Sequence, residues 1–307
     1  MRRFGLTLLY LFLCALRALC GDSALESQLA PLAKAHPGKV AIAVKHLGTG
    51  ESYYLNADEP MTTASLIKVA VMIEAYWQAQ EGKIKFDTML TLKKDDMVGG
   101  SGVLTDNFSP GATFCVRDAV RLMIAVSDNT ATNMVLDQTG IREVNQRMEK
   151  LGFPNTKINA KSFKGSTTSV DPERTKKFGL GSTTAREMVT IFEGLHQGKF
   201  VSPEACKQMI EHLKKCSDKD CFPRFLPDTV KLAHKTGAVS DARTDAGIMY
   251  FKQGPVVLCV LTNKNEDKRW VQDNAASVVC AKVAKEVYDY FNHKDHKEHK
   301  ETKKEER

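Results

Sequence analysis

Apolar residues recur at helical spacing in several segments of this chain. Between residues 24 and 35, Leu25, Leu29 and Leu32 share one helix face, and a Pro-Gly pair ends the pattern. Residues 152–182 have no regular period and are rich in Lys, Ser, Thr and Gly, which indicates an irregular segment. The same criterion predicts further helices at residues 66–80, 116–126, 131–138, 141–151, from 184 onward, and at 202–213.

Strand patterns lie near both ends of the chain. Residues 39–47 and 51–56 are rich in Val, Ile and Tyr and flank a Gly-Thr-Gly turn, which predicts a hairpin. Two more apolar strands are expected at residues 246–251 and 256–262. An amphipathic helix over residues 271–291 follows them. This order favours an α+β fold with one antiparallel sheet that is built from both chain ends.

The element order also predicts the domain organisation. Residues 21–60 and 214–293 are expected to form a discontinuous sheet domain covered by terminal helices, and residues 61–213 an inserted all-α domain. Residues 294–307 mix basic and acidic side chains without an aromatic residue, so we expect a charged, disordered tail.

The first twenty residues have the layout of a secretory signal peptide. Arg2 and Arg3 precede an apolar stretch that Arg17 interrupts, and small residues follow near Gly21. The stretch is too short for a stable membrane span. We therefore expect residues 1–20 to be removed and the mature chain to be exported, to the periplasm or the extracellular space.

Composition and charge exclude several other classes of protein. The 307 residues are 42% hydrophobic and 26% charged, as in ordinary globular domains. The net charge of +7 is spread along the chain, so a nucleic-acid partner is not expected. Neither a Cys-x-x-Cys pair nor a His-rich spacing occurs, and we expect no metal and no cofactor.

Six cysteines lie outside the expected signal peptide, enough for up to three disulfides in an exported protein. Cys206, Cys216 and Cys221 are close enough in sequence for one local bridge. Cys259 and Cys280 lie in apolar patterns, so both are also compatible with buried free thiols.

The first motif with chemical content is Ser65-Leu66-Ile67-Lys68. If Ser65 opens the helix, Ser65 and Lys68 lie three residues apart on one face, where amine and hydroxyl can meet. A lysine whose pKa is lowered by burial or by positive neighbours can remove the serine proton. The helix N-terminus adds a positive field and free backbone N–H groups. By itself this short motif has little specificity.

Two further motifs follow in order. Ser127-Asp128-Asn129 comes directly after an apolar helix, where such residues also serve as ordinary helix caps. Lys235-Thr236-Gly237, followed by Ala238, precedes a predicted strand. A lysine beside a hydroxyl on an edge strand can bind a substrate carboxylate, and Gly237 lets a ligand approach the backbone closely.

Together, the three motifs resemble the signature of the penicillin-recognising serine enzymes, and the chain is similar to class A β-lactamases over roughly residues 24–292. The stretches 126–133 and 235–247 carry much of the likeness. The resemblance implies the β-lactamase/transpeptidase-like fold: an antiparallel five-stranded sheet flanked by terminal helices, with an inserted all-α domain.

The resemblance assigns catalytic roles to the first two motifs. It implies that Ser65 attacks the lactam carbonyl and forms an acyl-enzyme, and that Lys68 activates Ser65 directly or through a water. Ser127 is expected to pass a proton to the departing nitrogen. Asn129 is expected to hydrogen-bond the side-chain amide of the substrate.

The third motif is implied to bind substrate. Lys235 and Thr236 are expected to hold the substrate carboxylate. Backbone N–H groups of Ser65 and Ala238 are expected to form the oxyanion hole. Arg243 either adds positive charge to this pocket or is an ordinary surface arginine.

The sequence departs from the family pattern at the deacylation step. Class A β-lactamases carry a glutamate in the irregular loop, and the best match here is Asp171-Pro172-Glu173. Asp171 aligns with the base position but is one methylene shorter, which is unfavourable for a base that must reach a water. Glu173 is the alternative base. A third interpretation is that both are solvated loop acids.

We therefore expect a monomeric, β-lactam-hydrolysing serine enzyme that acts through an acyl-enzyme on Ser65. Its substrate would be a small-molecule β-lactam or a peptidoglycan-like compound. The alternatives are a D-Ala-D-Ala peptidase-like enzyme and a penicillin-binding protein that is acylated without turnover. The uncertain acid at Asp171 or Glu173 keeps these alternatives open.

Overall fold

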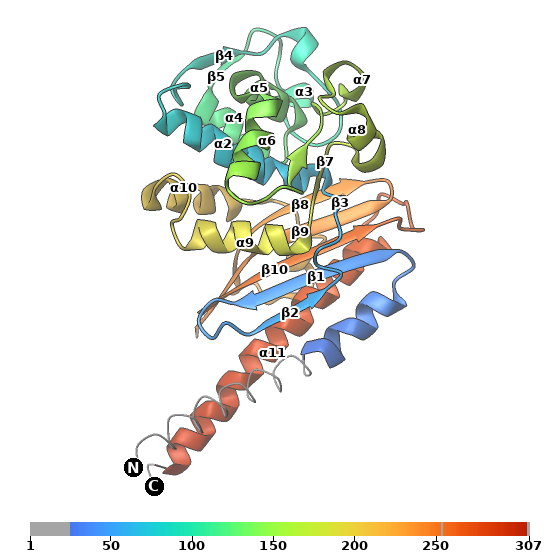
Figure 1. Cartoon of the computed structure of the whole chain (residues 1–307), viewed down its shortest axis with the longest axis vertical. Helices are drawn as coiled ribbons and strands as arrows, with labels where there is room; N and C mark the ends of the chain where they lie inside the picture. Colours follow the sequence, from blue (N-terminus) through green and yellow to red (C-terminus); the bar gives the residue numbers. More distant parts are fainter. Residues whose placement is uncertain (1–24, 253, 306–307) are drawn as a thin grey trace, which may run out of the picture.

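The computed structural model describes residues 25–252 and 254–305 (Figure 1). The expected signal peptide lies outside the described residues. A sheet layer lies between a block of helices and a pair of helices from the two ends of the chain, and the chain crosses from sheet to block and back. No helix in the described ranges combines the length and apolarity that a membrane crossing requires.

The central sheet has five antiparallel strands in the order β2-β1-β10-β9-β8. Strands β1 and β2 come from the start of the chain and the other three from its end, as the apolar patterns predict. Their bounds are β1 Lys39–His46, β2 Ser52–Leu55, β8 Lys231–Val239, β9 Ala242–Phe251 and β10 Gly254–Asn263. Strand β8 lies at the edge of the sheet and carries the Lys235 motif.

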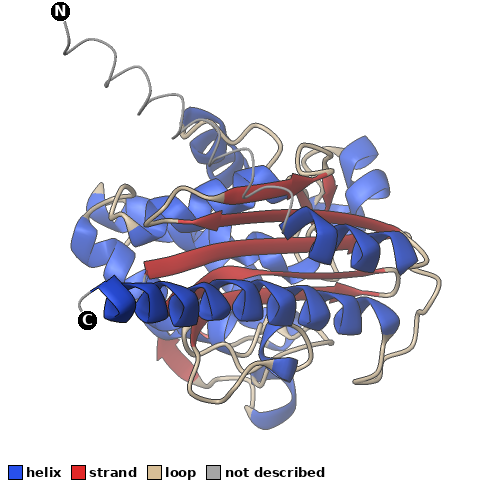
Figure 2. Cartoon of the chain, turned by 90° about the horizontal axis from the view of Figure 1, so that it is seen from below, coloured by secondary structure: helices blue, strands red, loops and turns tan. Residues whose placement is uncertain are grey.

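Helices cover both faces of this sheet. One face carries the helix at residues 25–35 and the first part of α11 (Ala275–Glu305), which lie in front of the sheet and run roughly along its strands in Figure 2. The other face carries α9 (Ala185–His196) and α10 (Pro203–Leu213). Both helices fall within residues 61–213, the segment expected to form the all-α domain. Their apolar stripes pack on the strands as well as on the helical block.

The helical block is built around α2 (Lys68–Gln80). This helix is buried on nearly all sides, as its almost uniform apolar character requires. The surrounding elements are η1 Ala64–Ile67, η2 Lys94–Asp96, α3 Leu104–Asn107, α4 Val116–Ala125, α5 Asn129–Thr139 and α6 Ile141–Lys150. Strands β4 (Met89–Thr91) and β5 (Thr113–Cys115) form a small hairpin beside it.

The segment 152–182 contains short elements that the sequence pattern does not predict. They are β6 Lys157–Ile158, α7 Gly165–Thr168, α8 Pro172–Phe178 and β7 Gly181–Thr183. Strand β7 pairs with β6 and with β3 (Met61–Thr62). Elements of two to seven residues are too short to show a hydrophobic period, so they escape a periodicity analysis.

Two expectations about the chain differ from the structure. Helix α11 continues through Glu305, where a disordered tail was expected; Lys and Glu, which dominate this segment, are good helix formers. The six cysteines outside the expected signal peptide are free thiols, and three of them are Cys206, Cys216 and Cys221. The expected local bridge is not formed in the structure, and the Cys206 thiol donates instead to the Phe200 carbonyl, 2.9 Å away.

Candidate active site

The expected nucleophile lies on a tight turn. Ser65 belongs to the 3-10 turn η1, and the α-helix proper begins at Lys68, so the motif spans one turn before the helix. Ala64 has φ +46°, a left-handed conformation that is unfavourable for a residue with a side chain. The turn is held by backbone bonds from Thr63 N to Gly181 O (3.0 Å) and from Leu66 N to Thr63 O (3.1 Å).

Strand β8 presses directly against this turn at Gly237. A Cβ atom at Gly237 would lie 2.2 Å from the carbonyl oxygen of Thr63 and 2.8 Å from Leu66 N. The same carbonyl accepts a hydrogen bond from Thr244 Oγ1 on β9, at 2.9 Å. The glycine is therefore needed for the approach of the nucleophile's own turn, in addition to any ligand.

Lys68 is fully buried and its amine contacts the second motif. Its Nζ donates to Ser127 O at 2.6 Å and to Asn129 Oδ1 at 2.8 Å, and it lies 3.2 Å from Ser127 Oγ. Burial, and then the charge of Lys235, lowers the pKa of Lys68 well below 10.5. A lysine whose pKa is lowered in this way can accept a proton at a lower pH than an ordinary lysine.

Ser127 joins the two lysines. Lys235, also fully buried, donates from Nζ to Ser127 Oγ at 3.0 Å and to Thr236 O at 2.8 Å. Burial also lowers the pKa of Lys235. Because both amines donate to Ser127 Oγ, the hydroxyl proton of Ser127 points away from the two lysines. Ser127 has φ +55°, and this strained conformation places its hydroxyl between the amines.

The loop at residues 99–104 fastens the second motif. Asp128 caps α5 through Ala131 N (2.8 Å), and its other oxygen accepts Val103 N at 2.7 Å. Asn129 N donates to Ser101 O at 3.0 Å. Both oxygens of the Asp128 carboxylate therefore accept structural hydrogen bonds from the backbone, and the carboxylate is not free to react.

A cavity of about 860 Å³ opens over these residues. Of the expected site residues, it is lined by Ser65, Ser127, Asn129, Thr236, Gly237, Ala238 and Arg243. The amines of Lys68 and Lys235 lie beneath it, in contact with Ser127. The exposed aromatic side chains of Phe163 and Trp270 also line it.

Two of the expected substrate-binding groups already have partners. Thr236 Oγ1 donates to Asp218 Oδ2 at 2.9 Å, so a carboxylate of the chain itself holds this hydroxyl. The Arg243 guanidinium donates to the carbonyls of Val239 and Ala242 and lies 4.6 Å from the centre of the Trp270 ring. Arg243 is buried, and its contacts stabilise the β8–β9 reversal and the loop that carries Trp270.

The two expected loop acids lie away from the cavity in the described structure. Asp171 is the N-cap of α8, where its carboxylate accepts Arg174 N at 3.0 Å. Glu173 lies in the first turn of that helix and is exposed. The Asp-Pro-Glu triplet is a helix start, with an acidic cap, proline at the first position and a further acid in the first turn.

The irregular segment contributes Ser162, Phe163 and Leu180 to the cavity lining. The hydroxyl of Ser162 is buried without a hydrogen-bond partner among the described residues. Its backbone is clamped by Asn133, whose Nδ2 donates to Ser162 O (3.0 Å) and whose Oδ1 accepts Ser162 N (2.8 Å). No motif marks Ser162, because its position depends on this contact between distant segments.

Phe163 places an aromatic ring beside the loop at residues 99–104. A Cβ atom on Gly100 would lie 2.9 Å from the Phe163 ring, so the ring covers that loop. Phe163 is 71% exposed and has φ +56°. An exposed aromatic held in a strained conformation at a cavity rim is typical of a ligand contact.

Comparisons with known proteins agree with this geometry. A β-lactamase of Streptomyces albus G is 24% identical over 249 residues, which cover 78% of this chain and 77% of that protein. The crystal structure of a β-lactamase from Sphaerobacter thermophilus has a TM-score of 0.76 at 25% identity, covering 86% of this chain and 97% of the other. PBP-A has the same TM-score and identity, covering 88% and 96% of the two chains. A mutant of PBP-A was solved as an acyl-enzyme complex with penicillin G.

The fold is thus the β-lactamase/transpeptidase-like α+β fold, with the five-stranded antiparallel sheet that the sequence implies. The model of the β-lactamase enzyme family matches residues 24–291, which is nearly all of the chain after the expected signal peptide. The arrangement of Ser65, Lys68, Ser127 and Lys235 around one cavity fits that match. The chain belongs to the β-lactamase enzyme family.

Proposed function

We propose that this protein is a class A-like serine β-lactamase that opens lactam rings through an acyl-enzyme on Ser65. One observation carries the proposal: Ser127 Oγ lies 3.0 Å from the Lys235 amine and 3.2 Å from the Lys68 amine, at the wall of the cavity that Ser65 lines. This arrangement provides a proton path beside a nucleophile, which acyl transfer requires.

Acylation follows from the positions of these groups. Neutral Lys68 takes the proton of Ser65 as Ser65 Oγ bonds to the lactam carbonyl carbon. The carbon–nitrogen bond then breaks, and the nitrogen takes the proton of Ser127, which Lys68 replaces. Lys235 keeps positive charge beside Ser127 throughout. Backbone N–H groups of Ser65 and Ala238 are the proposed oxyanion donors, and both residues line the cavity.

Deacylation is proposed to use Lys68 again. Asp171 and Glu173 lie outside the described cavity lining, and Asp218, which lies inside it, is bonded to Thr236. The neutral amine of Lys68 would therefore take a proton from the incoming water, in the reverse of the first step. Lys68 would then act as the base in both acylation and deacylation. We expect deacylation to be the slower of the two steps.

The substrate class follows from the same cavity. The exposed rings of Phe163 and Trp270 favour a compound with an apolar side chain. Because Asp218 already accepts the Thr236 hydroxyl, a substrate carboxylate must displace Asp218 or bind at Lys235 alone. Relatives named β-lactamase favour lactam hydrolysis over the D-Ala-D-Ala peptidase alternative.

The test combines a chromogenic cephalosporin with the intact protein and measures both ring opening and protein mass. We expect sustained turnover after an initial burst, together with a transient adduct on Ser65. The Ser65→Ala variant should lose both signals. A stable adduct without turnover would instead favour the peptidase or the acylation-only protein, and no adduct at all would refute acylation of Ser65.

Export and a monomeric state are further parts of the proposal. The charged and apolar pattern of residues 1–20 supports export. The mass of the N-terminal peptide of the secreted protein tests whether this segment has been removed. In an oxidising compartment we expect Cys221 and Cys280 to form a disulfide, because both thiols are buried in one core cluster, where η3 (Phe222–Phe225) packs against α11. Loss of two hydrogens by mass, mapped to this pair, checks it, and gel filtration checks the monomer.

A further inference from the structure

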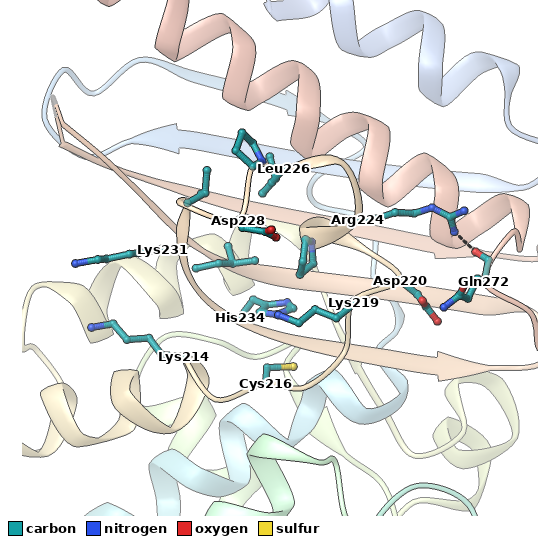
Figure 3. Close-up of a pocket in the computed structure, with 14 residues that line it drawn as sticks. Lys214, Cys216, Lys219, Asp220, Arg224, Leu226, Asp228, Lys231, His234 and Gln272 are labelled. Atoms are coloured by element: carbon teal, nitrogen blue, oxygen red, sulfur yellow. Dashed lines mark hydrogen bonds between the residues drawn. The ribbon is translucent and has the colours of Figure 1, made fainter.

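A second cavity, of about 810 Å³, opens on the other side of edge strand β8 (Figure 3). It is lined mainly by the segment from the end of α10 to the start of β8, and Ser65 is not part of its lining. Its wall contains the thiol of Cys216 and the imidazole of His234, which Figure 3 draws next to each other. Neither residue takes part in the proposed lactam chemistry.

His234 connects Cys216 to a buried carboxylate. Its Nδ1 lies 3.0 and 3.1 Å from the two carboxylate oxygens of Asp245, on the neighbouring strand β9. Phe222 N donates to the same carboxylate at 3.0 Å. With Nδ1 engaged, Nε2 is the ring atom left to meet the Cys216 thiol, which lines the same cavity. The order thiol, imidazole, carboxylate is that of an activated nucleophile.

The charges of these groups support one another. Burial acts to lower the pKa of His234, but Asp245 and Cys216 raise it to about 10, so the ring is a cation at neutral pH. Burial acts to raise the pKa of the Cys216 thiol, but His234 and then Lys235 reverse this and lower it. Burial also raises the pKa of Asp245, against the Phe222 N–H and the His234 cation. The two contacts to His234 and the N–H donor favour the ionised form of Asp245.

Basic side chains outnumber acidic ones in the described lining of this cavity: Lys214, Lys219, Arg224 and Lys231 against Asp220 and Asp228. Lys214 and Arg224 are paired with Glu211 and Asp273 outside the lining, so Lys219, Lys231 and the His234 ring supply the positive charge that a ligand meets. Cys216 itself is only 7% exposed, so a reagent must enter the cavity to reach the sulfur. A small anionic molecule is therefore selected by charge before it meets the thiol.

We propose that Cys216 is a second nucleophile of this protein, and that it exchanges with small anionic disulfides. The Cys216 thiolate attacks one sulfur of the disulfide, a new sulfur–sulfur bond forms, and the other half leaves as a thiolate. The pair of electrons that the thiolate donates is balanced by the pair that the leaving sulfur keeps. The leaving thiolate departs among the basic side chains, and Cys216 remains as a mixed disulfide.

The test uses dithiobis(nitrobenzoic acid), an anionic disulfide whose release is coloured, on the intact folded protein. Peptide mass mapping identifies which thiol is labelled first. Cys115 is the internal control, because it is more exposed than Cys216 and its thiol contacts only a carboxylate, Asp118 Oδ2 at 3.1 Å, among the described residues. Exposure alone predicts that Cys115 reacts first. We expect Cys216 to react first, by about tenfold.

Four variants separate the causes. Cys216→Ser should remove the fast label, and Ser65→Ala should leave it unchanged, so this result is independent of the lactamase proposal. His234→Gln can still bond to Asp245 but cannot carry charge, and it should slow labelling of Cys216 about tenfold. Lys219→Glu, an exposed change, should slow the anionic reagent and speed labelling by cationic cystamine. Melting curves check that each variant is folded.

Three results would overturn the proposal. They are first labelling at Cys115, a Cys216 rate in His234→Gln equal to that of the parent protein, and equal effects of Lys219→Glu on the anionic and cationic reagents. Because Lys219 is exposed, the last result is informative even if the buried His234 variant fails to fold.

Discussion

A methyl group at position 237 would meet the main chain that carries the nucleophile. In Gly237→Ala the new Cβ would lie 2.2 Å from Thr63 O, whereas real contacts of this kind are not found below 3.0 Å. The turn must therefore move by roughly 0.8 Å, which is close to the ~1 Å displacement that can cost about 100-fold in rate. Overpacking of this kind also costs about 1–3 kcal/mol of folding free energy.

The assay is the burst phase with a chromogenic cephalosporin, combined with thermal melting. Gly165→Ala is the matched control, because its Cβ would meet its nearest atom at 3.7 Å, in ordinary contact. We expect the Gly237 variant to acylate about 100-fold more slowly than the Gly165 variant. Acylation within threefold of the control, at an unchanged melting temperature, would refute the argument that this contact positions Ser65.

Three other predictions concern the base, the pH profile and the helical block. Asp171→Asn and Glu173→Gln should keep the deacylation rate within about twofold of that of the parent protein, whereas Ser162→Glu should raise it about tenfold or more by placing a carboxylate in the cavity. The measurement is the decay of the acyl adduct, followed by mass. A variant of Asp171 or Glu173 in which deacylation stops would restore that acid as the base. The acylation rate should rise with pH and level off well below 10.5, since Lys68 must be neutral. The unfolded chain keeps this proton up to about 10.5, so the contribution of Lys68 to stability improves as pH rises from the lowered folded-state pKa to about 10.5. Rapid mixing across pH checks the rate, and a flat profile would count against Lys68 as the base. Arg147→Met should lower the free energy of unfolding by about 3 kcal/mol, because it leaves the buried Glu74 carboxylate without the guanidinium 2.7 Å away. Arg121→Met, which removes an exposed pair with Asp118, should cost less than about 1 kcal/mol in urea unfolding, and equal losses would contradict this account.

The parts of the site that sequence could predict are those set by local spacing. Ser65 and Lys68 share one turn, and Ser127 and Lys235 stand in motifs whose residue types already indicate their chemistry. The sheet was predictable for a similar reason, since alternating and continuous apolar runs at both chain ends specify strands that must pair.

The remaining parts depend on contacts between distant segments. Ser162 reaches the cavity only because Asn133 clamps its backbone, and Asp218 meets Thr236 from a loop without a motif. The proline that suggests an alignment of Asp171 with a catalytic loop also starts a helix, and in the structure the Asp171 carboxylate caps that helix. His234 stands next to Lys235 in the sequence, but its partners come from elsewhere.

Strand β8 presents His234 and Lys235 to opposite sides of the sheet. Its neighbours follow the same alternation, with Leu232 packed in one core cluster and Ala233 in the other. A slip of one residue against β9 would therefore exchange the imidazole and the amine between the two cavities. Both nucleophiles would lose their partners in a single event, so any insertion or deletion within this strand should abolish ring opening and thiol exchange together.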